Sequence, residues 1–364
     1  MAPRTLAALS TLLLLTAGCG DDESGGGGGS GGTTATGGAG GTVTTGGSGT
    51  GGSSTTGSGT GGGTSEGFAC QYPGDVGIDG HAGVVWAENF EEGSVGAVLA
   101  RYDDYKNESG MALVADVPSV STGAASMQLT AGGGTNATDF YKSFGTGGFD
   151  DLYVRYYAKY EAGVNYHHTG VWVGGYNPPL SWPNPQAGSK PNGDDRFSVA
   201  IEIMTDGTLA SPRFDFYNYW MGMKTNPGGD FWGNTLIHDA SLVATFDWQC
   251  IEIHIRMNPD PTSAAGAELG VWRDDESIVQ YDDQGPIGRW LHDKFCRTEA
   301  DAPSCTDYTI PPPDVVLDLQ WRTTTDLTNS YFWPQNYITS GPAGNVWYDD
   351  MVLATERIGC ICPG

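Results

Sequence analysis

The chain has few basic residues. Its 364 residues include 17 Lys and Arg against 43 Asp and Glu, which gives a formal charge of -26 at neutral pH. Nucleic acids and anionic lipid surfaces are bound through clustered positive charge, so this composition argues against both as partners. It also argues, less strongly, against a highly charged anionic glycan unless basic groups converge in a cleft.

The chain also lacks a long hydrophobic run. The first apolar stretch, residues 6–15, follows Arg4 and is too short to cross a bilayer as a stable helix. No later segment is apolar enough to hold the protein in a membrane. Thr16, Ala17 and Gly18 then lead into Cys19. This stretch resembles a bacterial lipoprotein signal peptide, in which the cysteine carries lipid; the alternative is an ordinary secretory signal with an incidental cysteine.

Three parts of the chain follow from composition. Residues 1–18 are the expected signal peptide, and residues 19–67 are the expected tether. From residue 24 to 67 the tether is almost wholly Gly, Ser and Thr, a composition that cannot bury enough apolar surface to fold. Residues 68–364 are long enough for one large β-domain. We therefore expect an exported, lipid-anchored protein at the bacterial cell envelope, whose only membrane contact is the N-terminal lipid.

Seven cysteines agree with export. If Cys19 carries lipid, an even number remains, which predicts three disulfides in an oxidising compartment. These six are Cys70, Cys250, Cys296, Cys305, Cys360 and Cys362. The spacing favours a local Cys296–Cys305 pair, and Cys70 with Cys360 or Cys362 would join the two ends of the domain. Clustered Cys and His spacing for a metal is missing.

The sequence of the folded part predicts an all-β domain, because short runs in which apolar and polar residues alternate are separated by Gly, Pro, Asn and Asp. No capped stretch shows helical periodicity over three turns, although residues 285–295 could form a short helix. So many strands indicate a two-sheet antiparallel jelly-roll sandwich. The expected strands include residues 151–160, 197–203, 213–220, 250–257, 268–273, 315–322 and 345–353.

The two ends of this part resemble a known superfamily. Residues 85–93 (VWAENFEEG) and 346–359 (VWYDDMVLATERIG) look like the first and last strands of concanavalin A-like jelly rolls. Residues 154–160, 248–258 and 268–274 are similar to its polysaccharide-lyase-like branch. The resemblance implies the jelly-roll fold and a carbohydrate ligand. The Glu-x-Asp-x-x-Glu strand of retaining glucanases in this superfamily, which would place two carboxyls about 5–5.5 Å apart, is missing.

Elimination from a uronate needs a group that quenches the carboxylate, a base and an acid. His168 is the preferred base, with its neighbour His167, and Tyr217 is the expected acid. Three arginines could quench the carboxylate if their strand faces line one groove: Arg155, Arg213 and Arg322. The alternative is that the histidines are structural and that Arg and Tyr only cover the sheets.

Sugar binding calls for exposed rings beside hydrogen-bonding side chains. The candidates are Trp172, Tyr157, Tyr219, Trp182 and Gln320. Trp182 stands in a proline-rich segment that favours an exposed loop, whereas rings inside strands can equally fill the core.

Acidic residues near both ends suggest one metal. Asp349 and Asp350 could hold a structural calcium together with Glu88 or Asn89, because carboxylate oxygens suit that ion; an ordinary acidic strand end is the alternative. No other cofactor is required.

These observations predict a monomeric, surface-anchored protein that binds a polysaccharide in a concave groove and cleaves it as a lyase. The alternatives are a non-catalytic glycan-binding or adhesion module and a structural surface protein without a ligand.

Overall fold

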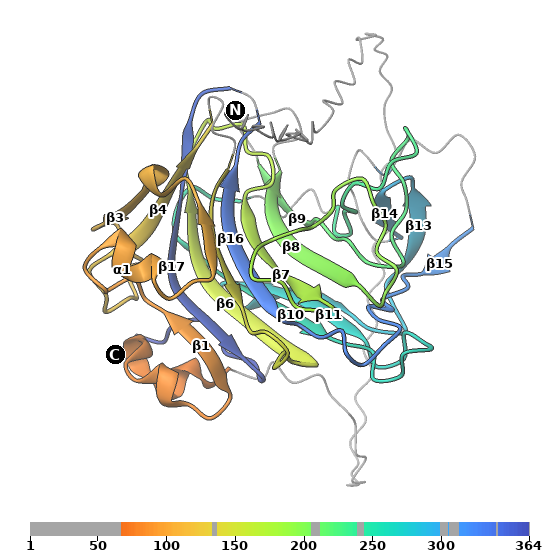
Figure 1. Ribbon diagram of the computed structural model, residues 1–364, viewed down its shortest axis with the longest axis horizontal. Coiled ribbons are helices and arrows are strands. Elements are labelled where there is room, and N and C mark those ends of the chain that lie inside the picture. The colour runs from red at the N-terminus through yellow and green to blue at the C-terminus, as the bar shows by residue number, and fades with distance from the viewer. Residues whose placement is uncertain are drawn as a thin grey trace, which may run out of the picture. The chain divides into compact units, whose positions relative to one another are not determined.

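The computed structural model describes residues 67–132, 137–204, 212–238, 244–298, 305, 313–339 and 341–363 (Figure 1). The predicted signal peptide, Cys19 and nearly all of the predicted tether lie outside these residues.

Two antiparallel sheets form the domain. Sheet A has eight strands in the order β12-β11-β10-β6-β17-β4-β3, with β1 also paired to β17. Its strands are β1 (Val84–Glu88), β3 (Met111–Val114), β4 (Ser126–Ala131), β6 (Asp151–Tyr160), β10 (Gln249–Arg256), β11 (Glu268–Arg273), β12 (Glu276–Tyr281) and β17 (Gly344–Ala354).

Sheet B has six strands in the order β2-β5-β16-β7-β8-β9. They are β2 (Asp104–Lys106), β5 (Ala137–Ser143), β16 (Tyr331–Tyr337), β7 (Gly170–Tyr176), β8 (Arg196–Met204) and β9 (Arg213–Phe216). A small third sheet has the order β14-β13-β15, with β13 (Ile287–Leu291), β14 (Lys294–Arg297) and β15 (Val315–Val316).

The core lies between sheets A and B. Alternation sends Leu152, Val154 and Tyr156 of β6 inward, and it does the same for Val199 and Ile201 of β8; all are buried. Ring contacts join the layers, with centroids 5.8 Å apart for Tyr160 and Phe214 and 6.4 Å apart for Phe216 and Tyr281. Figure 1 shows the two layers, with β16, β7 and β8 in one and β6, β10 and β11 in the other. The predicted two-sheet jelly-roll sandwich is confirmed.

Helical structure is short where it occurs in the described residues. The α-helix α1 (Val95–Leu99) starts at Ser94, whose hydroxyl accepts the amide hydrogen of Ala97 at 3.2 Å. Four 3₁₀ turns are η1 (Phe68–Gln71), η2 (Pro73–Asp75), η3 (Ile78–Gly80) and η4 (Glu108–Gly110).

The short helix predicted in residues 285–295 is wrong. This segment contains β13 and the start of β14, which pair as an antiparallel hairpin. Trp290 and Phe295 contact each other across it, with ring centroids 5.1 Å apart. A cross-strand aromatic pair stabilises a hairpin, and the apolar residues of so short a segment fit either period. The strands predicted at 213–220 and 315–322 are present but shorter.

Three disulfides close the fold. The bridge Cys296–Cys305 is confirmed, with Cα atoms 5.5 Å apart, and Cys70 pairs with Cys362 at 4.9 Å. The remaining pair, Cys250–Cys360, joins the C-terminal segment to β10. Three disulfides indicate an exported protein. No helix among the described residues is long and apolar enough to cross a membrane.

Candidate functional site

Polar side chains cross the outer face of sheet B in one line. Residues directly opposite each other on neighbouring strands share a face. The strand register pairs Asp139 of β5 with Gln335 of β16, Gln335 with Gly170 of β7, Gly170 with Glu202 of β8, and Glu202 with Asp215 of β9. We call these five residues the carboxylate row. The row brings three buried carboxyl groups to one face.

The next line of side chains is aromatic. Trp333 of β16 pairs with Trp172 of β7, which pairs with Ala200 of β8. The carbonyl of Ala200 accepts a hydrogen bond from the backbone of Tyr217. Ring centroids are 5.6 Å apart for Trp172 and Trp333 and 5.8 Å apart for Trp172 and Tyr217. Trp333, Trp172 and Tyr217 form what we call the aromatic row.

His168 lies where these two rows meet. Its Nδ1 is 3.0 Å from Oε2 of Glu202, and its ring centroid is 4.4 Å from that of Tyr217. Tyr337, at the end of β16, has its ring centroid 5.8 Å away. The imidazole is 17% exposed, so it can be reached from solvent. The arrangement joins an imidazole, a carboxylate and two phenols within a small area.

Burial sets the protonation of two groups on this face. It raises the pKa of Tyr217 well above its usual value, helped by the neighbouring Tyr219, so the phenol keeps its proton at neutral pH. Burial also raises the pKa of Asp139 to about 6, opposed only in part by Lys106 and Trp333. A carboxyl with such a pKa exchanges its proton in the pH range of biology.

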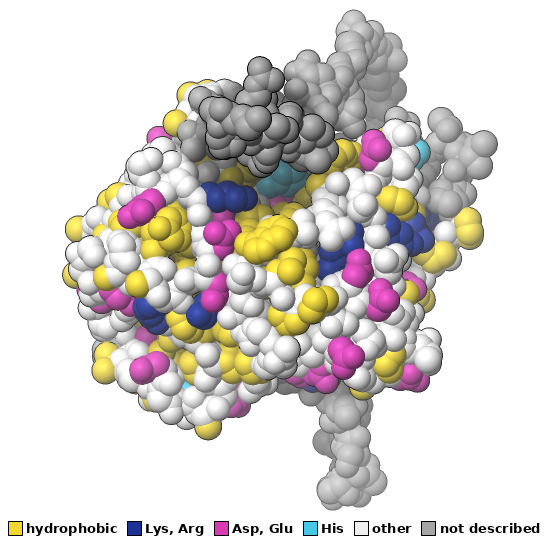
Figure 2. Space-filling view, viewed as in Figure 1, with side chains coloured by type: hydrophobic (Ala, Val, Ile, Leu, Met, Phe, Trp, Pro, Cys, Tyr) yellow, Lys and Arg dark blue, Asp and Glu magenta, His cyan; other side chains and the backbone are white. Residues whose placement is uncertain are grey.

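Figure 2 shows histidine side chains on this side of the molecule, beside apolar, basic and acidic ones. The neighbours of His168 belong to β8, β16, β7 and the segment after β9. The site is therefore built from segments that are far apart in the sequence.

Several predicted site residues come together here. His168 and Tyr217 are neighbours, and His167 is exposed, with its ring centroid 3.9 Å from that of His168. Trp172 and Tyr219 have ring centroids 6.3 Å apart, but Trp172 is only 3% exposed, so it supports the rings around it more than it offers a free surface. Among the three predicted arginines, only Arg213 is on sheet B, opposite Met204 at the β8–β9 pair.

The prediction that Arg155 and Tyr157 meet His168 in one groove is wrong. Both are on β6, on the outer face of sheet A. Arg155 is fully buried and forms an ion pair with Asp75. The hydroxyl of Tyr157 accepts the backbone amide of Ile361 at 2.9 Å. Alternation correctly placed these two side chains on one face of their strand, but it could not assign that strand to a sheet.

Arg322 and Gln320 are also placed elsewhere than predicted. Arg322 is buried, paired with Asp150, and donates to the carbonyls of Asn258 and Leu327. Gln320 donates to the carbonyl of Pro261 at 2.7 Å. These contacts fix loops at an edge of the sandwich, so neither residue meets His168.

Trp182 is exposed, as predicted. It is 48% exposed and belongs to the connection between β7 and β8. Hydrogen bonds tie this connection to sheet B: Tyr141 donates to the carbonyl of Leu180 at 3.1 Å, and the amide of Asn184 donates to the Tyr176 hydroxyl at 2.8 Å. Whether Trp182 contacts a sugar stays a prediction.

The sequence reasoning missed Gln335, Tyr337 and Asp139 as residues of this site. Trp333, Gln335 and Tyr337 alternate along residues 331–337, and this period-two pattern could have placed them on one face. Glu202 is a polar residue on an otherwise apolar strand, but its partner His168 lies just before a different strand, β7. No sequence pattern marks Asp139 as a site residue, because its burial depends on how β2, β5 and β16 pack together.

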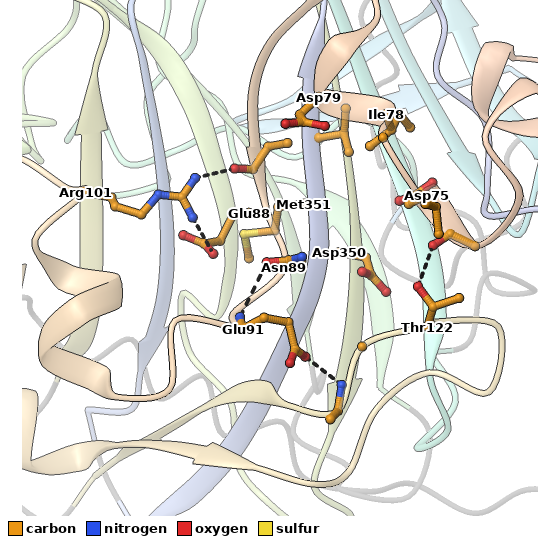
Figure 3. A pocket seen from close by; sticks show the side chains of 17 residues that line it. Asp75, Ile78, Asp79, Glu88, Asn89, Glu91, Arg101, Thr122, Asp350 and Met351 are labelled. Carbon is orange, nitrogen blue, oxygen red and sulfur yellow. Dashed lines mark hydrogen bonds and ion pairs between the residues drawn. The ribbon is translucent and has the colours of Figure 1, made fainter.

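A cavity of about 570 Å³ lies apart from His168, between segments near the start and the end of the folded part (Figure 3). Asp350 projects toward it, is 6% exposed, and has an Oδ2 without a hydrogen-bond partner among the described residues. Oδ1 of Asp75 is also buried and has no hydrogen-bond partner among the described residues. Other lining side chains are Asp79, Glu88, Asn89, Glu91, Arg101 and Thr122.

The predicted calcium ligands Glu88 and Asp349 do not fit this geometry. Oε1 of Glu88 accepts Arg101 at 3.0 Å and the amide of Phe90 at 2.9 Å, and burial raises the pKa of Glu88 to about 7. Asp349 does not line the cavity. In the described part of the chain, no three His, Cys, Asp or Glu are arranged to hold a metal ion. Asp350 and Asp75 each line the cavity with a carboxylate oxygen that has no hydrogen-bond partner among the described residues.

No family model matches this chain, and no curated protein matches it. Solved structures with a similar course of the chain include an alginate lyase from Chlorella virus, with 10% identity, a TM-score of 0.46, and coverage of 74% of this chain and 99% of that one. An alginate lyase in complex with alginate tetrasaccharide has 10% identity and a TM-score of 0.45, covering 76% and 95%. An endo-beta-1,4-glucuronan lyase from the fungus Trichoderma reesei has 12% identity and a TM-score of 0.42, covering 74% and 95%. At these values the likenesses carry no functional argument, and the function proposed below rests on this chain's own side chains.

Proposed function

We propose that the outer face of sheet B binds a uronate polysaccharide and cleaves it by elimination. The observation that carries the proposal is the position of His168 beside Tyr217, with ring centroids 4.4 Å apart. An imidazole and a protonated phenol at this separation can serve as base and acid on one substrate.

The reaction needs two proton transfers. His168 takes the proton from the ring carbon next to the uronate carboxylate, and that C–H electron pair becomes the new carbon–carbon double bond. The bond from the neighbouring ring carbon to the glycosidic oxygen breaks at the same time. Tyr217 gives its proton to that oxygen, and its raised pKa means that the proton is present at neutral pH.

The negative charge that develops on the uronate carboxylate needs a donor. Arg213 is the predicted arginine that remains on this sheet. Gln335, in the carboxylate row, offers an amide N–H for the same purpose. Trp172 and Trp333 are 3% and 6% exposed, so they support the ring of Tyr217 and do not offer a free surface to a sugar.

The test is incubation with a panel of uronate polysaccharides, followed by ultraviolet absorbance of the unsaturated product. We expect His168→Ala and Tyr217→Phe each to lower turnover by about 100-fold or more, because each removes one proton-transfer group. Tyr157→Phe, on the opposite sheet, is the control and should leave turnover unchanged. If no uronate polymer yields product, or if His168→Ala is as active as the parent, the elimination proposal fails.

A second candidate is a glycan-binding module without catalysis. The exposed Trp182 favours it, since an exposed ring can stack on a sugar with or without chemistry. Saturable binding of a polysaccharide from the same panel, with no product formed, would select this candidate.

The exported protein is further proposed to be lipid-anchored through Cys19 at the cell envelope. The apolar stretch before Cys19 and the polar composition after it support this. Cys19→Ser should move the protein from the detergent phase to the aqueous phase or block its processing. A variant that partitions like the parent contradicts the anchor.

A further inference from the structure

We propose that Glu202 is the positioning residue for His168: its carboxylate holds Nδ1, so that Nε2 presents a free electron pair to the substrate. This inference rests on the proposed function, because it assigns how the base of that reaction is oriented. It adds a residue that would not touch the substrate itself.

The contact is direct and buried. Oε2 of Glu202 lies 3.0 Å from Nδ1 of His168, and Glu202 is 2% exposed. Glu202 is on β8 and His168 lies two residues before β7, and Gly170, directly opposite Glu202, adds no side chain beside the carboxylate. The other oxygen, Oε1, has no hydrogen-bond partner in the described ranges. His168 is therefore the side chain that satisfies this buried carboxylate among the described residues.

The chemistry of the pair fixes the tautomer. An ionised carboxylate only accepts hydrogen bonds, so the proton of a neutral imidazole must be on Nδ1. The electron pair of the ring is then on Nε2, the nitrogen that a base uses to take a proton. A ring free to adopt either tautomer would present the competent nitrogen for only part of the time.

The backbone of His168 is also held in an uncommon conformation. His168 has a φ of +58°, a left-handed conformation that is uncommon for a residue with a side chain. Such conformations persist where surrounding contacts hold them, and they concentrate at functional sites. The hydrogen bond to Glu202 ties this residue to β8 just before β7 begins.

The other groups that face the imidazole come from three further segments. They are His167 before it, Tyr217 after β9 and Tyr337 on β16. The two tyrosines bring phenols and His167 a second imidazole. Glu202 is the carboxylate in this set, so removing its charge should change the pH dependence of the base.

The first arm of the test needs only the parent protein without substrate. Imidazole ¹⁵N chemical shifts of His168 should show the proton on Nδ1 above neutral pH. A proton on Nε2 overturns the inference. Because no variant is used, this arm decides even if Glu202→Gln does not fold.

The second arm compares variants on a cleaved polymer. Glu202→Gln should lower kcat by about tenfold or more, with a smaller change in KM, and should displace the acidic limb of the pH–rate profile, because a neutral amide can accept from or donate to the ring. The matched control is Glu252→Gln, a buried glutamate on sheet A that accepts the amides of Ile358 and Gly359 at 2.7 and 3.1 Å. It should lower stability and leave the pH profile in place.

The outcomes separate the two proposals. An unchanged pH profile in Glu202→Gln overturns the inference while leaving the lyase proposal intact. If no polymer is cleaved, the lyase proposal fails, and the tautomer of His168 in the parent alone decides whether Glu202 positions the ring.

Discussion

Replacing Asp139 with Asn should stabilise the protein at neutral pH. Asp139 is fully buried on β5, and neither carboxylate oxygen has a hydrogen-bond partner among the described residues. Burial raises its pKa to about 6, from about 4 in an unfolded chain. A difference of about 2 between the two pKa values corresponds to about 3 kcal/mol of folding free energy.

The direction of the pH dependence follows from which state binds the proton more tightly. Between pH 4 and 6, roughly, the folded protein keeps the proton of Asp139 while the unfolded chain releases it, so stability falls as the pH rises. Below about pH 4 both states are protonated and the cost disappears. Above about pH 6 the full cost of about 3 kcal/mol is present. Asn is similar in shape and never ionises, so it removes only the pH-dependent part.

Urea unfolding of the parent and Asp139→Asn at several pH values measures this difference. We expect the variant to be more stable by about 2–3 kcal/mol at pH 7.5 and by less than about 1 kcal/mol at pH 4. Asp104→Asn, on the neighbouring strand β2 and partly exposed, is the control and should change stability by less than about 0.5 kcal/mol at both pH values. A variant that is less stable than the parent at pH 7.5, or a gain of equal size at both pH values, refutes the reasoning.

Three further predictions concern the ends of the domain and its exposed loop. Replacing Cys70 and Cys362 with Ser should lower the free energy of unfolding by about 2–5 kcal/mol, because their bridge spans 292 residues; unchanged denaturant unfolding would count against this. A structural calcium is proposed at Asp350. Calcium at 100 times its Kd should raise the free energy of unfolding of the parent by about 3 kcal/mol and leave that of Asp350→Asn unchanged, which Tm values with and without EDTA measure. Equal Tm shifts in both proteins exclude Asp350. Trp182→Ala should weaken glycan binding by up to about tenfold without changing unfolding, because the side chain is 48% exposed; unchanged binding in titration calorimetry removes Trp182 from the site.

The local sequence pattern was sufficient to predict most strands and part of the disulfide pairing. The alternation in residues 151–160 and 268–273 predicted β6 and β11 with the same bounds as the structure. Cysteine spacing predicted the Cys296–Cys305 bridge, because two cysteines nine residues apart can close a loop without help from the rest of the fold. The prediction of a helix in residues 285–295 failed because the hairpin there depends on a contact between Trp290 and Phe295, and the sequence of this segment has no distinctive period.

The site was harder to predict, because sheet membership is a long-range property. Period-two alternation assigned Arg155 to a strand face, but the partner strands of β6 are β10 and β17, about 100 and 190 residues away along the chain. His168 and Tyr217 could be named from residue type, whereas the Glu202–His168 contact needed the β7–β8 register. When strands with polar faces belong to two different sheets, residue type alone selects candidate site residues from both sheets.

The bridge between Cys70 and Cys362 has a mechanical consequence. The chain enters the described domain at Gly67, and Phe68 donates its amide to the carbonyl of Arg357, so both ends leave from one place. A pulling force applied at the N-terminal side passes through Cys70 to Cys362, and through Cys360 to Cys250 in β10. These two covalent links fasten the start of the described domain to its C-terminal segment, and that segment to β10 of sheet A. Neither link involves a strand of sheet B, which carries the residues around His168.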